Sequence, residues 1–108
     1  METDALAETR DWIRENPLTL LVFTTPDCGV CNALRPAVEQ VAARHSLLQV
    51  RYVDLDQSPG IAGQFGVFVV PVYVLSVLGK ETVRFARHFG IRELEEAVER
   101  YSSVLEDR

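Results

Sequence analysis

The chain has 108 residues, of which 47% are hydrophobic and 25% are charged, a composition that is ordinary for a folded globular protein and excludes a disordered one. Its net charge of -5 argues against nucleic acid or an anionic membrane as the main partner. The longest apolar stretch, residues 65–78, is too short to cross a bilayer and is interrupted by Gly66 and Pro71. We expect a single domain over residues 1–108.

The first expected element is an acidic amphipathic helix over residues 4–15, which lacks the apolar core of an export signal. It should end at Asn16-Pro17, because the residue before a proline is disfavoured in helical backbone. Residues 18–24, LTLLVFT, form a nearly continuous apolar run that is typical of a strand buried on both faces. The absence of an export signal predicts a cytoplasmic location, where structural disulfides are rare.

A second helix is expected over residues 28–45, and Pro36 inside it should kink it. Its buried stripe follows three- and four-residue steps through Cys31, Leu34, Val38, Val41 and His45. Residues 49–55 form a second expected strand. Ser58-Pro59 then resembles a helix cap followed by a first-turn proline, which predicts a short helix to about Gln64.

The last third of the chain predicts a hairpin and a helix. Residues 72–78 form an apolar strand, Gly79-Lys80 a tight turn and residues 81–87 an alternating strand with Val83 and Phe85 on one side. Helical spacing then recurs at Ile91, Leu94, Val98, Tyr101 and Leu105. The order is a helix followed by βαβαββα. Because a crossover helix joins parallel strands and a hairpin joins antiparallel ones, this predicts a three-layer α/β domain with a mixed four-stranded sheet.

Both cysteines lie in one motif, Cys28-Gly29-Val30-Cys31, which by itself fits a redox pair, half a zinc site or a structural disulfide. Cys28 is expected where a buried strand ends and a helix begins, so unpaired backbone N–H groups and the positive end of the helix dipole favour its thiolate. Cys31 should be less exposed, because it lies on the apolar stripe. An exposed thiolate with a buried partner is the asymmetry that dithiol exchange requires.

The pattern from about Leu18 to the C-terminus resembles the thioredoxin family. The CGVC motif stands at the family's active-site position, and Pro36 matches its helix-kinking proline. Residues 56–60, DQSPG, are similar to the turn before the family's second helix, and Val70-Pro71 falls where the family places its cis-proline. The resemblance implies a thioredoxin-like three-layer α/β sandwich.

The same resemblance implies the roles of the site residues. Cys28 would be the attacking nucleophile and Cys31 the resolving cysteine of a protein disulfide oxidoreductase without a cofactor. A cis Pro71 would hold the backbone of Val70 open to pair with an extended substrate segment, and Gly29 and Val30 would lie close to that substrate. The implied partners are protein disulfides and dithiols, with a thioredoxin reductase-type electron donor.

Three positions depart from the family pattern. Asp27 replaces a tryptophan before the first cysteine; it is expected to modulate the site by capping the helix and by opposing a neighbouring thiolate. Val22 and Tyr52 stand where thioredoxins carry a buried aspartate and its lysine partner. Without that pair, the proton of Cys31 must leave by another route, which predicts slower exchange.

Two features predict contacts with another chain. The family's additional first strand is missing, so the strand at residues 49–55 is expected to be a sheet edge, bare or covered by the N-terminal helix or a second chain. Phe68 and Val69 are either ordinary strand-core residues or an apolar patch for a substrate or partner. A homodimer through the sheet edge or the patch near Phe68 is a further hypothesis.

The cysteines could instead bind zinc, with His45 and His88 as the remaining good donors besides carboxylates. No second histidine follows His45 at finger spacing, so no metal site is predicted. Among rival functions, a non-catalytic redox-sensing or protein-interaction module is the main alternative. The residues around Thr25 resemble a glutaredoxin, but the lysine that glutaredoxins usually carry at that position is missing. Thr25 also resembles a peroxiredoxin motif, but this chain has Leu21 where that motif has its upstream proline.

Overall fold

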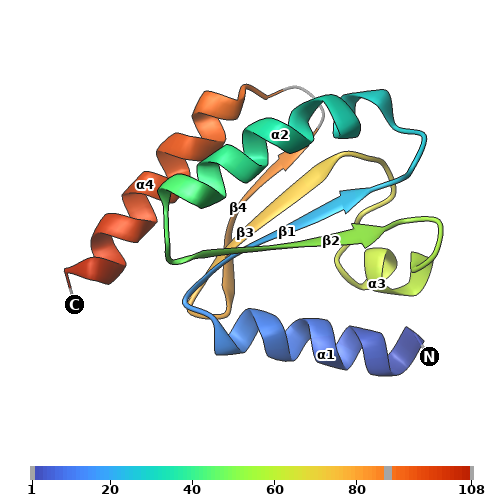
Figure 1. Cartoon of the computed structure of the whole chain (residues 1–108). Coiled ribbons are helices and arrows are strands. Elements are labelled where there is room, and N and C mark those ends of the chain that lie inside the picture. Colours follow the sequence, from blue (N-terminus) through green and yellow to red (C-terminus); the bar gives the residue numbers. More distant parts are fainter. Residues whose placement is uncertain (1, 87–88, 108) are drawn as a thin grey trace.

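The computed structural model describes residues 2–86 and 89–107 and has the predicted order of elements (Figure 1). The first helix begins earlier than expected and ends, as predicted, before Asn16-Pro17. The elements are α1 (Glu2–Glu15), β1 (Leu18–Thr24), α2 (Gly29–Arg44), β2 (Leu48–Asp54), α3 (Pro59–Gln64), β3 (Val72–Val77), β4 (Lys80–Ala86) and α4 (Ile91–Glu106). None of the helices in the described ranges is long and apolar enough to span a membrane.

The four strands form one mixed sheet, as predicted, and their order is β2-β1-β3-β4. β1 is parallel to β2 and antiparallel to β3, and β3 is antiparallel to β4. The first six residues of β1 are buried, because this strand has a neighbour on each side and helices over both faces. The continuous apolar run of Leu18–Thr24 therefore reflects a central strand.

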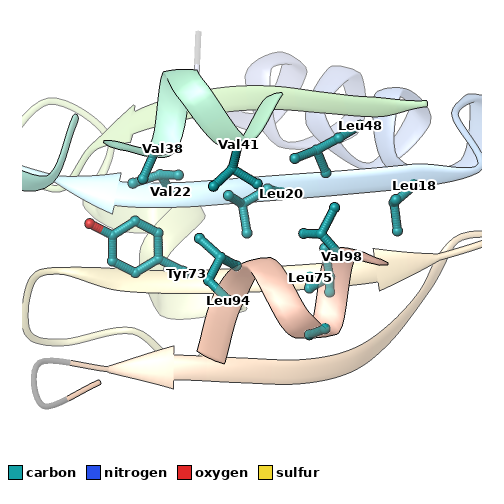
Figure 2. Packing of buried hydrophobic residues seen from close by; sticks show 11 residues of the cluster. Leu18, Leu20, Val22, Val38, Val41, Leu48, Tyr73, Leu75, Leu94 and Val98 are labelled. Atoms are coloured by element: carbon teal, nitrogen blue, oxygen red, sulfur yellow. The ribbon is translucent and has the colours of Figure 1, made fainter. Parts of the chain in front are cut away.

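Each face of the sheet carries its own core. Even-numbered residues of β1 pack under α2 and α4 with residues of β3, as Figure 2 shows for Leu18, Leu20, Val22, Tyr73 and Leu75. Odd-numbered residues of β1, Leu21 and Phe23, pack on the opposite face with α1 and α3. The alternation of side chains along one strand thus accounts for all three layers.

β2 forms one edge of the sheet, as expected, and in the described ranges it pairs only with β1. α1 contacts this strand through Arg51, whose guanidinium binds the Glu8 carboxylate at 2.8 and 2.7 Å and lies 4.7 Å from the ring centre of Trp12. α1 therefore lies on the face beside the edge, and a second chain at the edge itself stays a prediction.

The hairpin turn lies one residue earlier than predicted. Leu78 and Gly79 form it, with φ of 51° and 85°, and Lys80 already belongs to β4. Positive φ at both central positions is characteristic of a type I′ turn, a conformation that the apolar Leu78 did not suggest. The predicted strand to residue 87 ends at Ala86 in the described range, and residues 87 and 88, including His88, lie outside it.

α3 begins at Pro59, as predicted, and Ser58 occupies its N-cap position. Its side chain makes no capping hydrogen bond, although its backbone N–H donates to the Asp54 carbonyl at 2.9 Å. The turn before α3 is instead held by the Asp54 carboxylate, which accepts from the N–H groups of Asp56 and Gln57 at 2.9 and 3.3 Å. The Asp54 carboxylate therefore orders the turn that precedes the helix.

An ion-pair network joins the ends of α2 and α4. Arg44 binds Glu95 through Nε and Nη2, both at 2.7 Å, and His45 Nε2 lies 3.2 Å from one oxygen of that carboxylate. The hydrogen bonds from Arg44, with a smaller contribution from His45, hold the pKa of Glu95 below its usual range. The folded state therefore gains stability from the ionised carboxylate.

We expect Glu95→Gln to destabilise the protein at about pH 7 by up to about 1 kcal/mol, a small effect because the pair is solvent-screened. Because the folded-state pKa is lowered, this difference is fully present above the ordinary carboxyl pKa and disappears as the pH falls through the lowered one. Urea unfolding of both proteins across that range measures it. Glu96→Gln, at an exposed position of the same helix, is the control, and an equal effect there would contradict the assignment.

Candidate active site

The two cysteines lie where β1 ends and α2 begins. Cys28 is the N-cap of α2, with extended φ and ψ of -82° and 105°, and the Cys31 N–H donates to its sulfur at 3.2 Å. Cys28 and Cys31 form a disulfide, with their Cα atoms 5.3 Å apart. The motif therefore forms a disulfide within the first turn of one helix.

Backbone hydrogen bonds fix the loop that carries Cys28. The Cys28 N–H donates to the Thr25 carbonyl at 3.2 Å, and the side-chain amide of Asn32 donates to the Pro26 carbonyl at 3.1 Å. The Leu55 N–H donates to the Thr24 carbonyl at 2.8 Å, which ties this loop to the one before α3. Hydrogen bonds at the ends of β1 and β2 thus fix the loop that carries Cys28.

The predicted asymmetry of exposure is confirmed. Cys28 is half-buried, whereas Cys31 is 6% exposed, and Gly29 and Val30 between them face solvent. Cys28 and the two residues after it are therefore accessible from solvent, whereas Cys31 is almost fully covered. This is the access pattern of an attacking and a resolving cysteine.

Val70 and Pro71 lie at the same end of the sheet as the cysteines. Their peptide bond is cis, and Pro71 is buried immediately before β3, which pairs Val72 with Phe23 near the end of β1. Val70 is only partly buried and precedes the strand, so its backbone is not part of the β3 ladder.

Phe68 and Val69 are not strand-core residues, so that alternative is wrong. Both precede β3 and are 78% and 50% exposed, and Val30 in the first turn of α2 is 54% exposed. Their neighbour Val67 is 2% exposed, and Pro71 is buried. Because Val67 and Pro71 are buried on either side of them, Phe68 and Val69 face solvent at the active-site end. We call Val30, Phe68 and Val69 the apolar patch.

The charges around the cysteines are acidic. Asp27 is exposed and is not the helix cap, because Cys28 itself occupies the N-cap position. Asp54, the last residue of β2, and Asp56 flank Leu55, whose N–H donates to the Thr24 carbonyl at the start of the loop that carries Asp27. Stabilisation of a Cys28 thiolate must therefore come from backbone N–H groups and the start of α2, against these carboxylates.

Two tyrosines flank Val22, and the sequence predicts no role for either hydroxyl. Val22 pairs with Tyr52 on one side and with Tyr73 on the other. The Tyr52 hydroxyl donates to Glu39 at 3.2 Å, and burial, together with that carboxylate, raises its pKa to about 12. Tyr73 is 1% exposed, and burial raises its pKa too. Both phenols stay protonated at neutral pH, so neither is a base for Cys31.

The zinc alternative is not supported by the geometry of the described residues. Cys28 and Cys31 lie at the start of α2, whereas His45 is its C-cap, about 24 Å away along 16 residues. His45 instead meets Glu95 and Glu99, with donor atoms within 4.8 Å of one another, but Arg44 already binds Glu95. A guanidinium in this group opposes a cation there.

Comparison with known proteins identifies the family. The thioredoxin family profile matches residues 4–100, so the chain belongs to the thioredoxin family. It is 28% identical to the thioredoxin-like protein YdfQ of Bacillus subtilis, over 94% of this chain and 91% of that protein. It is 39% identical to a thioredoxin of Chlamydia muridarum, over 62% of this chain and 66% of that protein.

Solved thioredoxins share the fold. A mutant thioredoxin of Halobacterium salinarum superposes with a TM-score of 0.80 at 28% identity, covering 89% of this chain and 84% of that one. Thioredoxin 1 of Thermosipho africanus gives 0.75 at 28% identity, covering 82% and 98%. The α/β thioredoxin-like fold is thus confirmed, and family membership with the Cys28–Cys31 pair supports thiol–disulfide oxidoreductase activity in general.

We expect the two thiols to differ in reactivity after reduction. At neutral pH the Cys31→Ser protein, which keeps Cys28, should react with iodoacetamide at least about tenfold faster than the Cys28→Ser protein, because Cys28 is both more exposed and next to backbone donors. Intact mass at timed intervals measures both rates. Similar rates in the two variants would contradict the assigned asymmetry.

Proposed function

We propose that this protein exchanges its Cys28–Cys31 dithiol or disulfide with protein substrates in the cytoplasm, with a thioredoxin reductase-type electron donor. One observation carries the proposal: a half-buried Cys28 at a helix N-cap, closed by a disulfide to a buried Cys31. The N-cap sulfur already accepts a backbone N–H, a contact that would also favour its thiolate.

In the reducing direction, the Cys28 thiolate attacks one sulfur of a substrate disulfide and forms a mixed disulfide. The second substrate sulfur leaves as a thiolate and takes up a proton. Cys31 then loses its proton and attacks the Cys28 sulfur, which forms the Cys28–Cys31 disulfide and releases the first substrate thiol. Two electrons pass from the dithiol to the substrate, and no cofactor is needed.

The second step needs an acceptor for the Cys31 proton. Val22 offers none, and the flanking tyrosines keep their protons, so water or the leaving substrate thiolate takes this role. We expect slower resolution than with a buried base. The lack of a proton acceptor at Val22, Tyr52 and Tyr73 favours a second candidate function, a non-catalytic redox-sensing or interaction module.

Substrate binding would use the surface around Cys28. The Val70 backbone beside Pro71 would pair with an extended segment next to the substrate disulfide, and Gly29 would allow it to approach. The apolar patch would contact side chains of that segment. Asp27 would modulate the site by lowering affinity for acidic substrates and by opposing the Cys28 thiolate. The same patch or the β2 edge would serve a homodimer.

The Cys31→Ser protein should trap a mixed disulfide with a disulfide-containing protein substrate, whereas Cys28→Ser should trap none. Non-reducing electrophoresis with mass analysis shows the adduct and its site. The unchanged protein should then reduce several equivalents of insulin disulfide per molecule when dithiothreitol resupplies electrons. A mixed disulfide in the Cys28→Ser protein would contradict the roles, and oxidation that stops at one equivalent would favour the sensing module.

Phe68→Ser should raise KM for a protein disulfide about tenfold, because it removes apolar surface that the substrate would cover. The redox midpoint in graded glutathione buffers should not change, since the cysteines keep their contacts. Val104→Ser, at a similarly exposed apolar position on α4, is the matched control. An unchanged KM for Phe68→Ser would show that the patch does not bind substrate.

A further inference from the structure

A cleft of about 350 Å³ lies away from the cysteines, between α1, the end of α3 and the β3–β4 hairpin. It belongs to the sheet face that α1 and α3 cover, opposite α2 and α4 (Figure 1). Its lining residues are Arg10, Ile13, Arg14, Gln64, Phe65, Val74, Ser76, Gly79, Glu81 and Arg84. None of them belongs to the active site described above.

The lining is positively charged although the chain carries a net charge of -5. Three arginines and one carboxylate, Glu81, line it; Glu81 pairs with Arg84 and Asp11 pairs with Arg14, which leaves the positive charge of Arg10 as the local surplus. Arg84 binds Glu81 through Nε and Nη2 at 2.9 and 2.8 Å, so its Nη1 is not used in that pair. The local surplus of positive charge favours an anion.

Arg10 is the cation best placed to receive that anion. Its guanidinium lies 5.2 Å from the ring centre of Phe65, and no carboxylate of the described residues lies within ion-pairing distance of it. Arg14, by contrast, is paired with Asp11. Arg10 is therefore held against an aromatic wall of the cleft with its hydrogen-bond donors available.

The floor of the cleft is apolar with one polar edge. Ile13 and Val74 are 6% and 1% exposed, and Phe65 is half-buried beside them. Ser76 also lines the cleft, and its cross-strand partner Thr19 has a buried hydroxyl without a hydrogen-bond partner among the described residues. Residues directly opposite one another share a sheet face, so the Thr19 side chain lies on the same face of the sheet as Ser76.

We propose that this cleft binds a phosphate monoester with a small apolar body. The phosphate would lie between Arg10, which has no carboxylate partner in the described residues, and the Nη1 of Arg84, with Ser76 as a further donor. The apolar body would cover Ile13, Phe65 and Val74. The volume suits a small organic ligand. This site is independent of the proposed redox function.

Phenyl phosphate is the probe. Titrated into the ¹⁵N-labelled protein, it should give saturable shifts of the amides of Gln64, Phe65, Ser76 and Gly79, and not of those at the cysteines. Arg10→Gln should raise its Kd about tenfold. Arg92→Gln, an exposed arginine of α4 on the opposite face, should leave Kd unchanged. Arg10→Lys keeps the charge but not the planar donor pair, and should fall between the two.

Two further probes separate the parts of the ligand. Inorganic phosphate, which lacks the apolar body, should bind more weakly at the same amides, and phenol, which lacks the anion, should give no saturable shift. The proposal is overturned if phenyl phosphate shifts none of the four amides, if phenol binds as well, or if Arg10→Gln and Arg92→Gln have the same Kd. Arg10 is exposed, so its substitution leaves the core intact, and the amide spectra of the variants report their folding directly.

Discussion

The site depends on where the central strand of the sheet ends. β1 has a neighbour on each side and a core on each face, so its position is fixed in every direction. Thr24, at its end, accepts a hydrogen bond from Leu55 of the neighbouring loop. Four residues later Cys28 caps α2, and its sulfur receives the Cys31 N–H. The reactive sulfur is therefore positioned by the best-packed part of the molecule rather than by a flexible loop.

The same core limits the chemistry. The face of β1 that packs under α2 carries Val22 between two tyrosines, and burial raises the pKa of both phenols. Burial therefore stabilises the fold here but supplies no base near the resolving cysteine. In the proposed function, attack by Cys28 would depend on backbone donors, which the fold provides, while departure of the Cys31 proton would depend on solvent or substrate. The two half-reactions are supported unequally by this structure.

Much of the fold could be predicted from the sequence, because its patterns are local. The apolar run at residues 18–24 and the stripe from Cys31 to Val41 specify a central strand and a buried helix face without knowledge of contacts. The positions that differed depend on backbone conformation or distant partners. Leu78 adopts positive φ in the turn, the Ser58 side chain makes no capping hydrogen bond, and Cys28 rather than Asp27 caps α2.

The candidate site was predictable in its cysteines but not in its surroundings. A spacing of two residues places both sulfurs in one helical turn, and the strand before them places them at a sheet end. The outward position of Phe68 depends on anchoring at Val67 and Pro71, which an apolar run from Val67 to Val72 does not reveal. The arginine cleft is lined by residues of α1 and β4, and Arg10 and Arg84 are 74 positions apart in the chain, so only the folded structure brings them together.

The surface around the cysteines and the cleft under α1 differ in the sign of their charge. Asp27 precedes Cys28, and Asp54 and Asp56 flank Leu55, which hydrogen-bonds to Thr24 at the start of the cysteine loop; in the proposed function these carboxylates would favour neutral or basic substrates. The cleft under α1 carries the opposite sign and would attract anions. Because exposed charges are screened beyond about 8–10 Å, each surface would select its partners locally although the whole chain is acidic. A phosphorylated small molecule and a protein disulfide would therefore not compete for the same surface.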